Sequence, residues 1–238
     1  MSGKTTKLTK DQRWYGRRHG RKLRPGRQAL MDEKLPALRV PVADDDAIVD
    51  PAALFDGAVN ALWMEIGFGT GEHLAELASR NPDIGFIGCE PFVNGVASLM
   101  AKIEDLGLTN VRIFDDDVRL LLPHMPEACL QRLYILFADP WPKTRHHRRR
   151  ITVPSNLRQF ARLLADDGRL MFASDQHDFA AWSLSHFLAD GSFEWAARRR
   201  ADWLTAPDDW VPTRYQIKAA RKDLHPVFLD MRRRPRGA

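Results

Sequence analysis

The sequence predicts a doubly wound α/β fold, in which helices cover both faces of a mostly parallel sheet. From residue 62 onward, short apolar runs alternate regularly with amphipathic segments of helical length. The run Leu133–Ala138 is apolar throughout, as expected of a buried strand. Parallel neighbours need crossover connections, and right-handed crossovers place helices over the sheet. With 238 residues, 44% of them apolar, the chain can bury such a core.

Each predicted element corresponds to one segment of this alternation. Five apolar runs are predicted strands: Leu62–Gly67, Gly85–Cys89, Val111–Phe114, Leu133–Ala138 and Arg169–Ala173. Four amphipathic segments are predicted helices: Glu72–Ser79, Asn94–Leu106, Pro154–Leu164 and Phe179–Leu188. Two later runs, Phe193–Arg199 and Val227–Arg233, are candidate strands, and the second is a candidate for antiparallel pairing.

The sequence before the first strand has a different composition. Residues 1–30 hold ten Lys and Arg and no apolar period, so we predict a basic flexible arm. Residues 31–60 are predicted to connect this arm to a domain over residues 61–238, whose C-terminal region is basic. We expect a cytoplasmic protein without a membrane span, because no apolar run is long enough for a signal peptide or a membrane helix. The two cysteines lack metal-ligand spacing, so no metal is expected.

Charge is distributed unevenly along the chain. Residues 40–142 carry 5 Lys and Arg against 17 Asp and Glu, whereas the remainder carries 31 against 14. An acidic core with basic flanks favours a polyanionic partner, although basic surfaces also serve solubility alone.

A glycine-rich loop follows the first predicted strand. Glu65, Gly67, Gly69 and Gly71 form an acid and a G-x-G-x-G pattern, and Glu72 occupies the third glycine position of a dinucleotide fingerprint. A carboxylate at a helix start disfavours a pyrophosphate. A cofactor with a cationic centre and no phosphate fits better, and S-adenosylmethionine has both properties. The alternative is a glycine-rich turn that binds nothing.

Acidic residues follow the next three predicted strands. Glu90 ends the second strand, where an acid can bind ribose hydroxyls. Asp115, Asp116 and Asp117 follow the third, and one of them could accept a hydrogen bond from the adenine amine. Asp139 follows the fourth. Each could instead face solvent, but the carboxyl ends of parallel strands are where such sheets bind ligands.

The segment 139–150 combines Asp139 with Trp141 and a basic run. Five cations and two histidines lie within residues 143–150. This combination suits an enzyme that acts on one base of a nucleic acid, while the alternative is a solvated basic loop. Trp141 could stack on a base or simply pack between its two flanking prolines. The predicted phosphate contacts are Lys143, Arg145, Arg148, Arg149 and Arg150.

Several of these segments together resemble motifs of the bacterial tRNA (guanine-N7-)-methyltransferases. The resemblance spans roughly residues 60–235, and the Asp-Pro-Trp-Pro-Lys block is its specific part. The matching segments are Glu65–Gly69, Asp139–Lys143, Arg145–Ile151 and Thr213–Tyr215, and Gly16–Gly20 is similar to the arm of some members. The resemblance implies a seven-stranded, Rossmann-like class I methyltransferase sheet, S-adenosylmethionine as cofactor and tRNA as partner. It further implies methylation at N7 of the variable-loop guanine, tRNA position 46.

The resemblance also implies roles for individual residues. It places Glu65, Glu90, Asp117 and Asp139 at the cofactor and catalytic site, and the loop glycines Gly67 and Gly69 beside the cofactor. The implied substrate contacts are Lys143, Asp175, Thr213, Arg214, Tyr215 and Gln216. One departure is Gln216, because the family usually has Glu there. Glycines that often follow are replaced by Ala219-Ala220-Arg221.

Asp139 is the predicted catalytic residue. Guanine N7 has a lone pair and no proton, so methyl transfer needs alignment and no general base. Asp139 would stabilise the positive charge that develops on the base, or would accept hydrogen bonds from guanine N1–H and the 2-amino group. Alternatives to this function are methylation of another RNA base or of a small molecule, a nucleotide-dependent oxidoreductase, and a noncatalytic RNA-binding protein that retains the fold.

Overall fold

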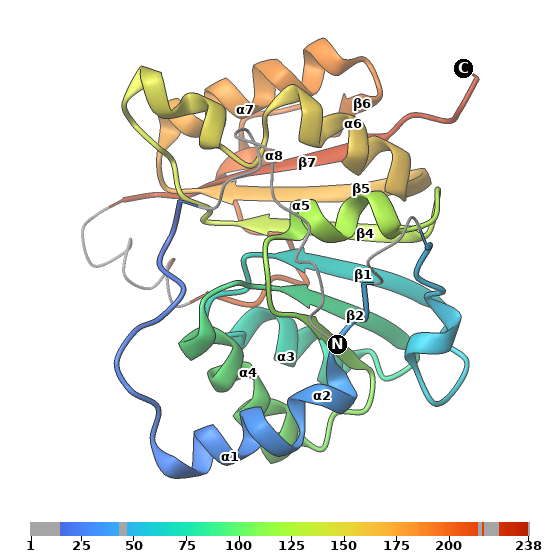
Figure 1. The fold of residues 1–238 in the computed structure, drawn as a ribbon. Helices are drawn as coiled ribbons and strands as arrows, with labels where there is room; N and C mark the ends of the chain where they lie inside the picture. The colour runs from blue at the N-terminus through green and yellow to red at the C-terminus, as the bar shows by residue number, and fades with distance from the viewer. Residues whose placement is uncertain (1–14, 43–46, 214–215, 217–223, 238) are drawn as a thin grey trace.

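A single sheet of seven strands runs through the centre of the protein. The computed structural model describes residues 15–42, 47–213, 216 and 224–237. The strand order is β3-β2-β1-β4-β5-β7-β6, and within it β7 pairs antiparallel with β5 and β6 while the other pairs are parallel (Figure 1). The strands are β1 (Ala61–Ile66), β2 (Ile84–Cys89), β3 (Val111–Phe114), β4 (Leu130–Leu136), β5 (Leu164–Ser174), β6 (Phe193–Trp195) and β7 (Val227–Arg233).

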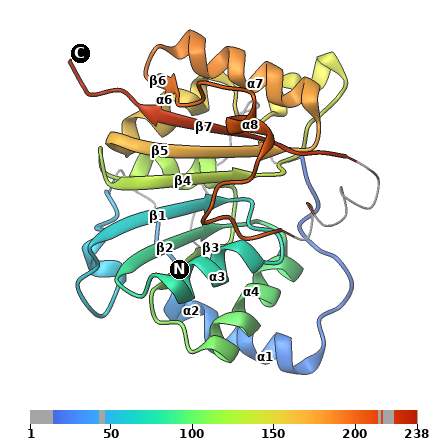
Figure 2. The same ribbon diagram turned by 180° about the vertical axis from the view of Figure 1, so that it is seen from behind.

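Helices cover both faces of this sheet (Figures 1 and 2). The α-helices are α1 (Pro25–Glu33), α2 (Leu35–Leu38), α3 (Glu72–Arg80), α4 (Val93–Leu106), α5 (Val118–Leu121), α6 (Pro154–Leu163), α7 (His177–Asp190) and α8 (Ala201–Leu204). Three short 3-10 helices within the described residues are η1 (Ala52–Leu54), η2 (Leu122–His124) and η3 (Thr144–Arg149).

The two faces bury separate hydrophobic clusters because successive side chains of a strand point to opposite faces. In β1, Leu62, Met64 and Ile66 pack with residues of α5, α6 and α7, whereas Trp63 packs with residues of α3 and α4 on the other face. Strands that are apolar on both faces are expected where helices cover both. The predicted doubly wound, mostly parallel fold is confirmed, as is antiparallel pairing of the last strand.

The elements differ from the prediction mainly at their ends. The strand predicted over Leu133–Ala138 ends two residues earlier, because Phe137 has a φ of 53° and turns the chain out of the sheet. The helix α1 begins at Pro25, inside the range predicted as an arm. Proline suits a first helical turn, and Leu30 of this helix packs against the core. The first 14 residues of the predicted arm lie outside the described residues.

No helix in the described part of the chain has the length and apolar character that a membrane span requires.

We predict that Phe172→Ala lowers the free energy of unfolding by about 3–5 kcal/mol, because it opens a cavity in the buried core. The Phe172 ring is fully buried and contacts the rings of Phe179 and Phe187 on α7. Chemical denaturation measures the change. Leu188→Ala is the matched control, since Leu188 on the same helix is 51% exposed, and a comparable loss there would contradict the assignment of this core.

Candidate functional site

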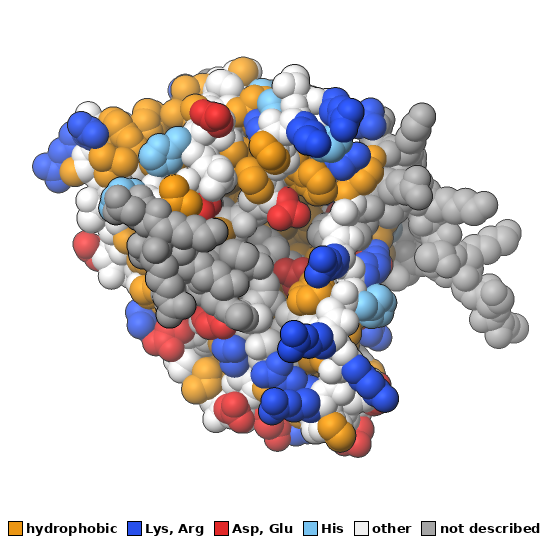
Figure 3. Space-filling view, turned by 90° about the vertical axis from the view of Figure 1, so that its left-hand side faces the viewer, with side chains coloured by type: hydrophobic (Ala, Val, Ile, Leu, Met, Phe, Trp, Pro, Cys, Tyr) orange, Lys and Arg blue, Asp and Glu red, His pale blue; other side chains and the backbone are white. Residues whose placement is uncertain are grey.

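A cavity of about 510 Å³ lies at the carboxyl ends of β1, β2, β3 and β4. Its size falls in the range of small-molecule sites. Figure 3 views this edge of the sheet and shows acidic side chains in a hollow, with Lys and Arg side chains gathered beside and above it. The residues that line the cavity from successive strand ends include Gly67, Gly69, Glu90, Asp116, Asp117 and Asp139. The structure therefore brings these strand-end residues together around one cavity.

The glycine-rich loop forms one wall of the cavity. Gly67 and Gly69 have φ values of 74° and 59°, which favour glycine. A Cβ atom added to Gly67 would meet no atom within 4 Å, so the backbone there is open to a ligand. On its other side the loop touches α4 closely, because a Cβ on Gly95 would lie 2.2 Å from the carbonyl oxygen of Gly69.

Glu90 joins this loop to the start of α4. One carboxylate oxygen accepts a hydrogen bond from the Gly69 N–H at 2.9 Å, and the other accepts one from the Phe92 N–H at 3.0 Å. Burial raises the pKa of Glu90, and the nearby charges of Asp139 and Glu65 raise it further, against the lowering effect of the two N–H donors. Each oxygen retains a second lone pair, so Glu90 can still accept hydrogen bonds from a ligand.

The three consecutive aspartates have three different partners. Asp115 forms an ion pair with Arg39 at 2.8 Å, and Asp116 pairs with Arg18. Asp117 is buried, caps α5 by accepting the Arg119 N–H at 3.0 Å, and pairs with the Arg119 guanidinium. Asp116 and Asp117 line the cavity together with Arg119. The sequence did not indicate Arg119, which neutralises part of the acidic charge at this end of the cavity.

Asp139 differs from the other acids because its carboxylate has no hydrogen bond or ion pair with any described residue. It lines the cavity just after β4, and burial raises its pKa. Phe137 and Trp141, which flank it, both have left-handed backbones with φ values of 53° and 44°. Such conformations cost about 1–3 kcal/mol each and gather at functional sites. The chain therefore holds an unpaired acid in a strained turn at the mouth of the cavity.

Two aromatic rings and one guanidinium group contact one another at the rim of the cavity. The Arg149 guanidinium lies 4.0 Å from the ring centre of Tyr15 and 5.0 Å from that of Trp141. All three residues line the cavity. Trp141, for which the sequence left stacking or packing open, is half-buried and has an edge contact with Tyr15. Tyr15 was not among the predicted site residues, although the adjacent aromatic residues Trp14 and Tyr15 in a basic segment could have indicated it.

Residues 15–21 form a strap against α4, and this strap brings Tyr15 to the rim. The Val93 N–H donates to the Arg18 carbonyl oxygen at 2.9 Å, and the Gly20 N–H donates to Asn94 Oδ1 at 2.7 Å. Asn94 Nδ2 donates in return to the Arg21 carbonyl oxygen at 2.7 Å.

The basic run does not form one uniform surface. Lys143, Arg145 and Arg148 are exposed, as phosphate contacts require. Arg150 contradicts its prediction: it is only 3% exposed, and its Nε donates to the Pro140 carbonyl oxygen at 2.8 Å. Its guanidinium lies over the Trp182 ring at 4.7 Å, so the side chain braces the turn from inside. The apolar surroundings of Arg150 could not be inferred from a run of consecutive cations.

The remaining predicted residues lie behind or beside the main cavity. Glu65 is buried and forms a 2.8 Å contact with His73 Nδ1. It lines a much smaller cavity of about 10 Å³ with Gly67 and Thr213. Asp175 follows β5 and is half-buried, outside the residues that line either cavity. The predicted contacts Arg214 and Tyr215 fall outside the described residues.

Gln216 has a defined partner. Its Oε1 accepts a hydrogen bond from Trp210 Nε1 at 2.6 Å, and its backbone N–H donates to Thr213 Oγ1 at 3.1 Å. No group of three or more His, Cys, Asp or Glu side chains in the described part of the chain is placed to hold a metal ion.

Comparison with known proteins identifies the family. A family model described as "Putative methyltransferase" matches residues 59–228. Over 234 residues, 98% of this chain and 92% of the relative, the chain is 48% identical to a tRNA (guanine-N(7)-)-methyltransferase of Rhodospirillum rubrum. The chain belongs to the tRNA (guanine-N(7)-)-methyltransferase family. A member from Hyphomonas neptunium is 44% identical over 92% of this chain and 99% of that member.

Solved structures show the same fold at low sequence identity. The 16S rRNA methyltransferase KamB has a TM-score of 0.56 and 15% identity, with coverage of 74% of this chain and 89% of that one. A structure described as an antibiotic-related methyltransferase has a TM-score of 0.54 and 15% identity, with coverage of 81% and 94%. These matches confirm the predicted Rossmann-like methyltransferase sheet for this member of the tRNA (guanine-N(7)-)-methyltransferase family.

We predict that Gly95→Ala weakens the binding of S-adenosylhomocysteine, the demethylated form of the family's methyl donor. The new methyl group would collide with the Gly69 carbonyl and push the loop into the cavity. Overpacking of this kind costs about 1–3 kcal/mol, which is roughly five- to hundredfold in affinity. Isothermal titration calorimetry measures the effect. Gly26→Ala is the control, because a Cβ there meets no atom within 4 Å. Equal affinities for both variants would show that the loop position does not matter.

Proposed function

We propose that this chain transfers a methyl group from S-adenosylmethionine to N7 of a guanine in tRNA, at position 46 of the variable loop, and that it works in the cytoplasm. Membership of the tRNA (guanine-N(7)-)-methyltransferase family supports the reaction class. The single structural observation that carries the proposal is Asp139, an acid without a partner among the described residues, at a cavity whose other acids are engaged.

The cavity fits such a cofactor in size and charge. Gly67 presents open backbone on one wall, Glu90 could accept hydrogen bonds from ribose hydroxyls, and Asp117 or its neighbour Asp116, which also line the cavity, could accept one from an adenine amine. Carboxylates around the cavity favour a cationic ligand and disfavour a phosphate. The cofactor supplies an electrophilic methyl group on a sulfonium centre. Glu65 does not line the main cavity, so it would affect the cofactor through Gly67, which lines both cavities.

Asp139 would serve the acceptor base. Methyl transfer to N7 would leave a positive charge on the guanine, and the fixed carboxylate of Asp139 at the cavity would stabilise that charge. No proton leaves N7, so the chain needs to supply alignment and electrostatics only. The raised pKa of Asp139 reflects burial, and binding of a cationic base would lower it again.

The exposed cations would hold the RNA. Lys143, Arg145 and Arg148 lie in the loop that starts beside Asp139, and they can neutralise phosphates near the target nucleotide. Trp141 at the rim offers a face for an unstacked base.

The deciding experiment maps 7-methylguanosine. The purified protein is incubated with S-adenosylmethionine and unmodified tRNA transcripts, which are then cleaved with borohydride and aniline. A single cut in the variable loop supports reaction, base and position together. Absence of a cut with cofactor binding intact would favour another RNA base as target, or a noncatalytic RNA-binding protein.

We predict that Asp139→Asn lowers kcat about a hundredfold, as loss of an electrostatic contact to a transition state does, while S-adenosylhomocysteine affinity stays nearly unchanged. Asparagine keeps the size of the side chain but removes the charge and one of the two acceptor oxygens, so this variant tests the carboxylate itself. Single-turnover methyl transfer is the measurement. Retention of full turnover would remove Asp139 from the mechanism.

The same variant should slightly stabilise the fold at neutral pH. Since burial raises the folded-state pKa of Asp139, its ionised form is penalised in the native protein. The penalty is absent below the ordinary carboxyl pKa and develops as pH rises through the raised pKa. The stability difference between Asp139→Asn and the parent should therefore shrink in acid, which denaturation at several pH values would measure.

We predict that Arg145→Ala and Arg148→Ala each weaken tRNA binding and reduce the slope of log K against log salt by about 1, because each removes one phosphate contact. Filter binding across a salt series provides the slope. Arg80→Ala is a control, since Arg80 ends α3 at the opposite edge of the sheet. Unchanged slopes for the first two variants would exclude this loop from the RNA interface.

A further inference from the structure

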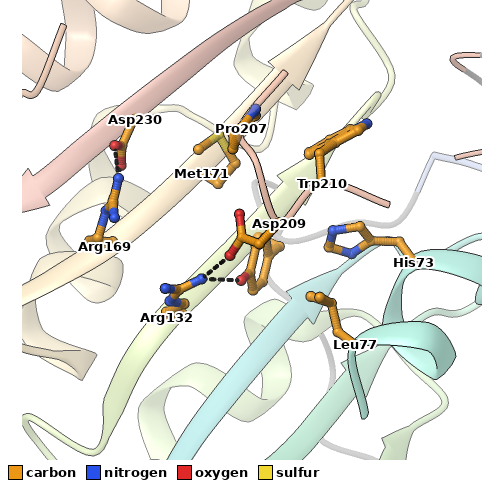
Figure 4. Close-up of a pocket in the computed structure, with 10 residues that line it drawn as sticks. His73, Leu77, Arg132, Arg169, Met171, Pro207, Asp209, Trp210 and Asp230 are labelled. Carbon is orange, nitrogen blue, oxygen red and sulfur yellow. Dashed lines mark hydrogen bonds and ion pairs between the residues drawn. The ribbon is translucent and has the colours of Figure 1, made fainter. Parts of the chain in front are cut away.

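Asp209 and Trp210, which follow α8, are anchored on the sheet face opposite α5 to α7. Asp209 pairs with Arg132 of β4 at 2.8 Å. The Trp210 ring lies between His73 of α3 and Phe228 of β7, with ring centres 5.3 and 4.9 Å away. Figure 4 shows Trp210 and His73 side by side, with Asp209 turned toward Arg132. The same segment continues into Thr213 and Gln216, so these contacts fix where the predicted substrate residues begin.

His73 connects this segment to the cofactor side. Its side chain is only 2% exposed, and Nδ1 lies 2.8 Å from Glu65 Oε2. Its ring also contacts the edge of Tyr134, with ring centres 5.0 Å apart. Glu65 lies behind the glycine loop, and Gly67 lines both the main cavity and the small cavity that Glu65 shares with Thr213.

These contacts form an uninterrupted path. It runs from Gln216 through the Trp210 indole N–H, across the stacked rings to His73, and by a hydrogen bond to Glu65. We propose that His73 is a positioning residue that couples Trp210 and Gln216 to Glu65, so that tRNA binding and cofactor binding strengthen each other. The inference rests on the proposed function, because it takes tRNA as the ligand that binds beside Thr213 and Gln216.

The path also gives Gln216 a role that a glutamate could share. The Trp210 indole N–H needs an acceptor, and the amide oxygen of Gln216 provides one at 2.6 Å. The carboxylate of a glutamate would accept this hydrogen bond equally well. Gln216 therefore keeps the hydrogen bond to Trp210 but carries no negative charge. Gln216 therefore contacts both Trp210 and Thr213, and its amide oxygen is already engaged by the indole.

Coupling distinguishes this role from that of an ordinary buried histidine. Any core histidine would lower stability when replaced, but it would not alter how one ligand affects the other. Linkage requires that tRNA tighten cofactor binding by the same factor as the cofactor tightens tRNA binding. Couplings of this kind are about five- to 150-fold, which calorimetry can resolve.

The test separates the two contacts of His73. His73→Phe keeps a ring against Trp210 but cannot donate to Glu65. His73→Asn keeps a short N–H donor but has no ring for Trp210. Trp210→Phe keeps the ring and removes the N–H that Gln216 accepts. Trp195→Phe is the control, because Trp195 lies on the edge strand β6. For each, the Kd of S-adenosylhomocysteine is measured without and with saturating unmodified tRNA.

For the parent, we expect tRNA to tighten S-adenosylhomocysteine binding at least about fivefold. His73→Phe should weaken binding without tRNA by about tenfold or more, as loss of a hydrogen bond to a charged group does. His73→Asn should bind nearly as the parent without tRNA but lose the effect of tRNA. Trp210→Phe should likewise lose only the effect of tRNA, and Trp195→Phe should match the parent.

Two results would overturn the proposal. One is a parent protein that produces 7-methylguanosine yet shows no effect of tRNA on cofactor affinity. The other is equal weakening by His73→Phe and His73→Asn in proportion to their lost stability, measured by thermal denaturation. If His73→Phe fails to fold, the effect of tRNA on His73→Asn and Trp210→Phe decides the matter. A parent that forms no 7-methylguanosine refutes the proposed function instead, and the two His73 variants without tRNA still test the bond to Glu65.

Discussion

The site depends on the two hydrogen bonds that the Glu90 carboxylate accepts. It accepts one N–H from the glycine loop after β1 and one from the start of α4, so a single side chain fixes two walls of the cavity. The cost is a buried negative charge close to Asp139 and Glu65, which raises the pKa of Glu90. A ligand that brings positive charge to this place relieves the repulsion. The Glu90 carboxylate therefore both holds the backbone of the cavity in place and favours a cationic ligand.

The acids of the site differ in whether an arginine neutralises them. Asp116 and Asp117 are compensated by Arg18 and Arg119, and the strand ends can therefore carry several carboxylates without unfolding. Asp139 is left uncompensated among the described residues, in a turn whose backbone is itself strained. The strained backbone at this position lowers the stability of the fold, and such strain is commonly found at active sites.

Sequence patterns predicted what local chemistry determines. The alternation of apolar runs gave the order of strands and helices, and the position of each acid after a strand placed Glu90, Asp117 and Asp139 at one cavity. The patterns could not predict contacts between distant segments. They predict Arg150 as a phosphate contact, whereas its partners, Pro140 and Trp182, are brought to it only by folding. The pairing of His73 with Glu65 and the stacking of Tyr15 on Arg149 are of the same kind.

The strap of residues 15–21 has a consequence for the order in which the protein matures. Its contacts are with α4, with Asp116 through Arg18, and with Trp141 and Arg149 through Tyr15. A ribosome makes the strap long before Trp141 and Arg149, so its final contacts cannot form until more than half of the chain has been synthesised. The rim of the cavity therefore joins an early part of the chain to a part that is made much later, and a nascent chain that ends before η3 cannot present the complete cavity.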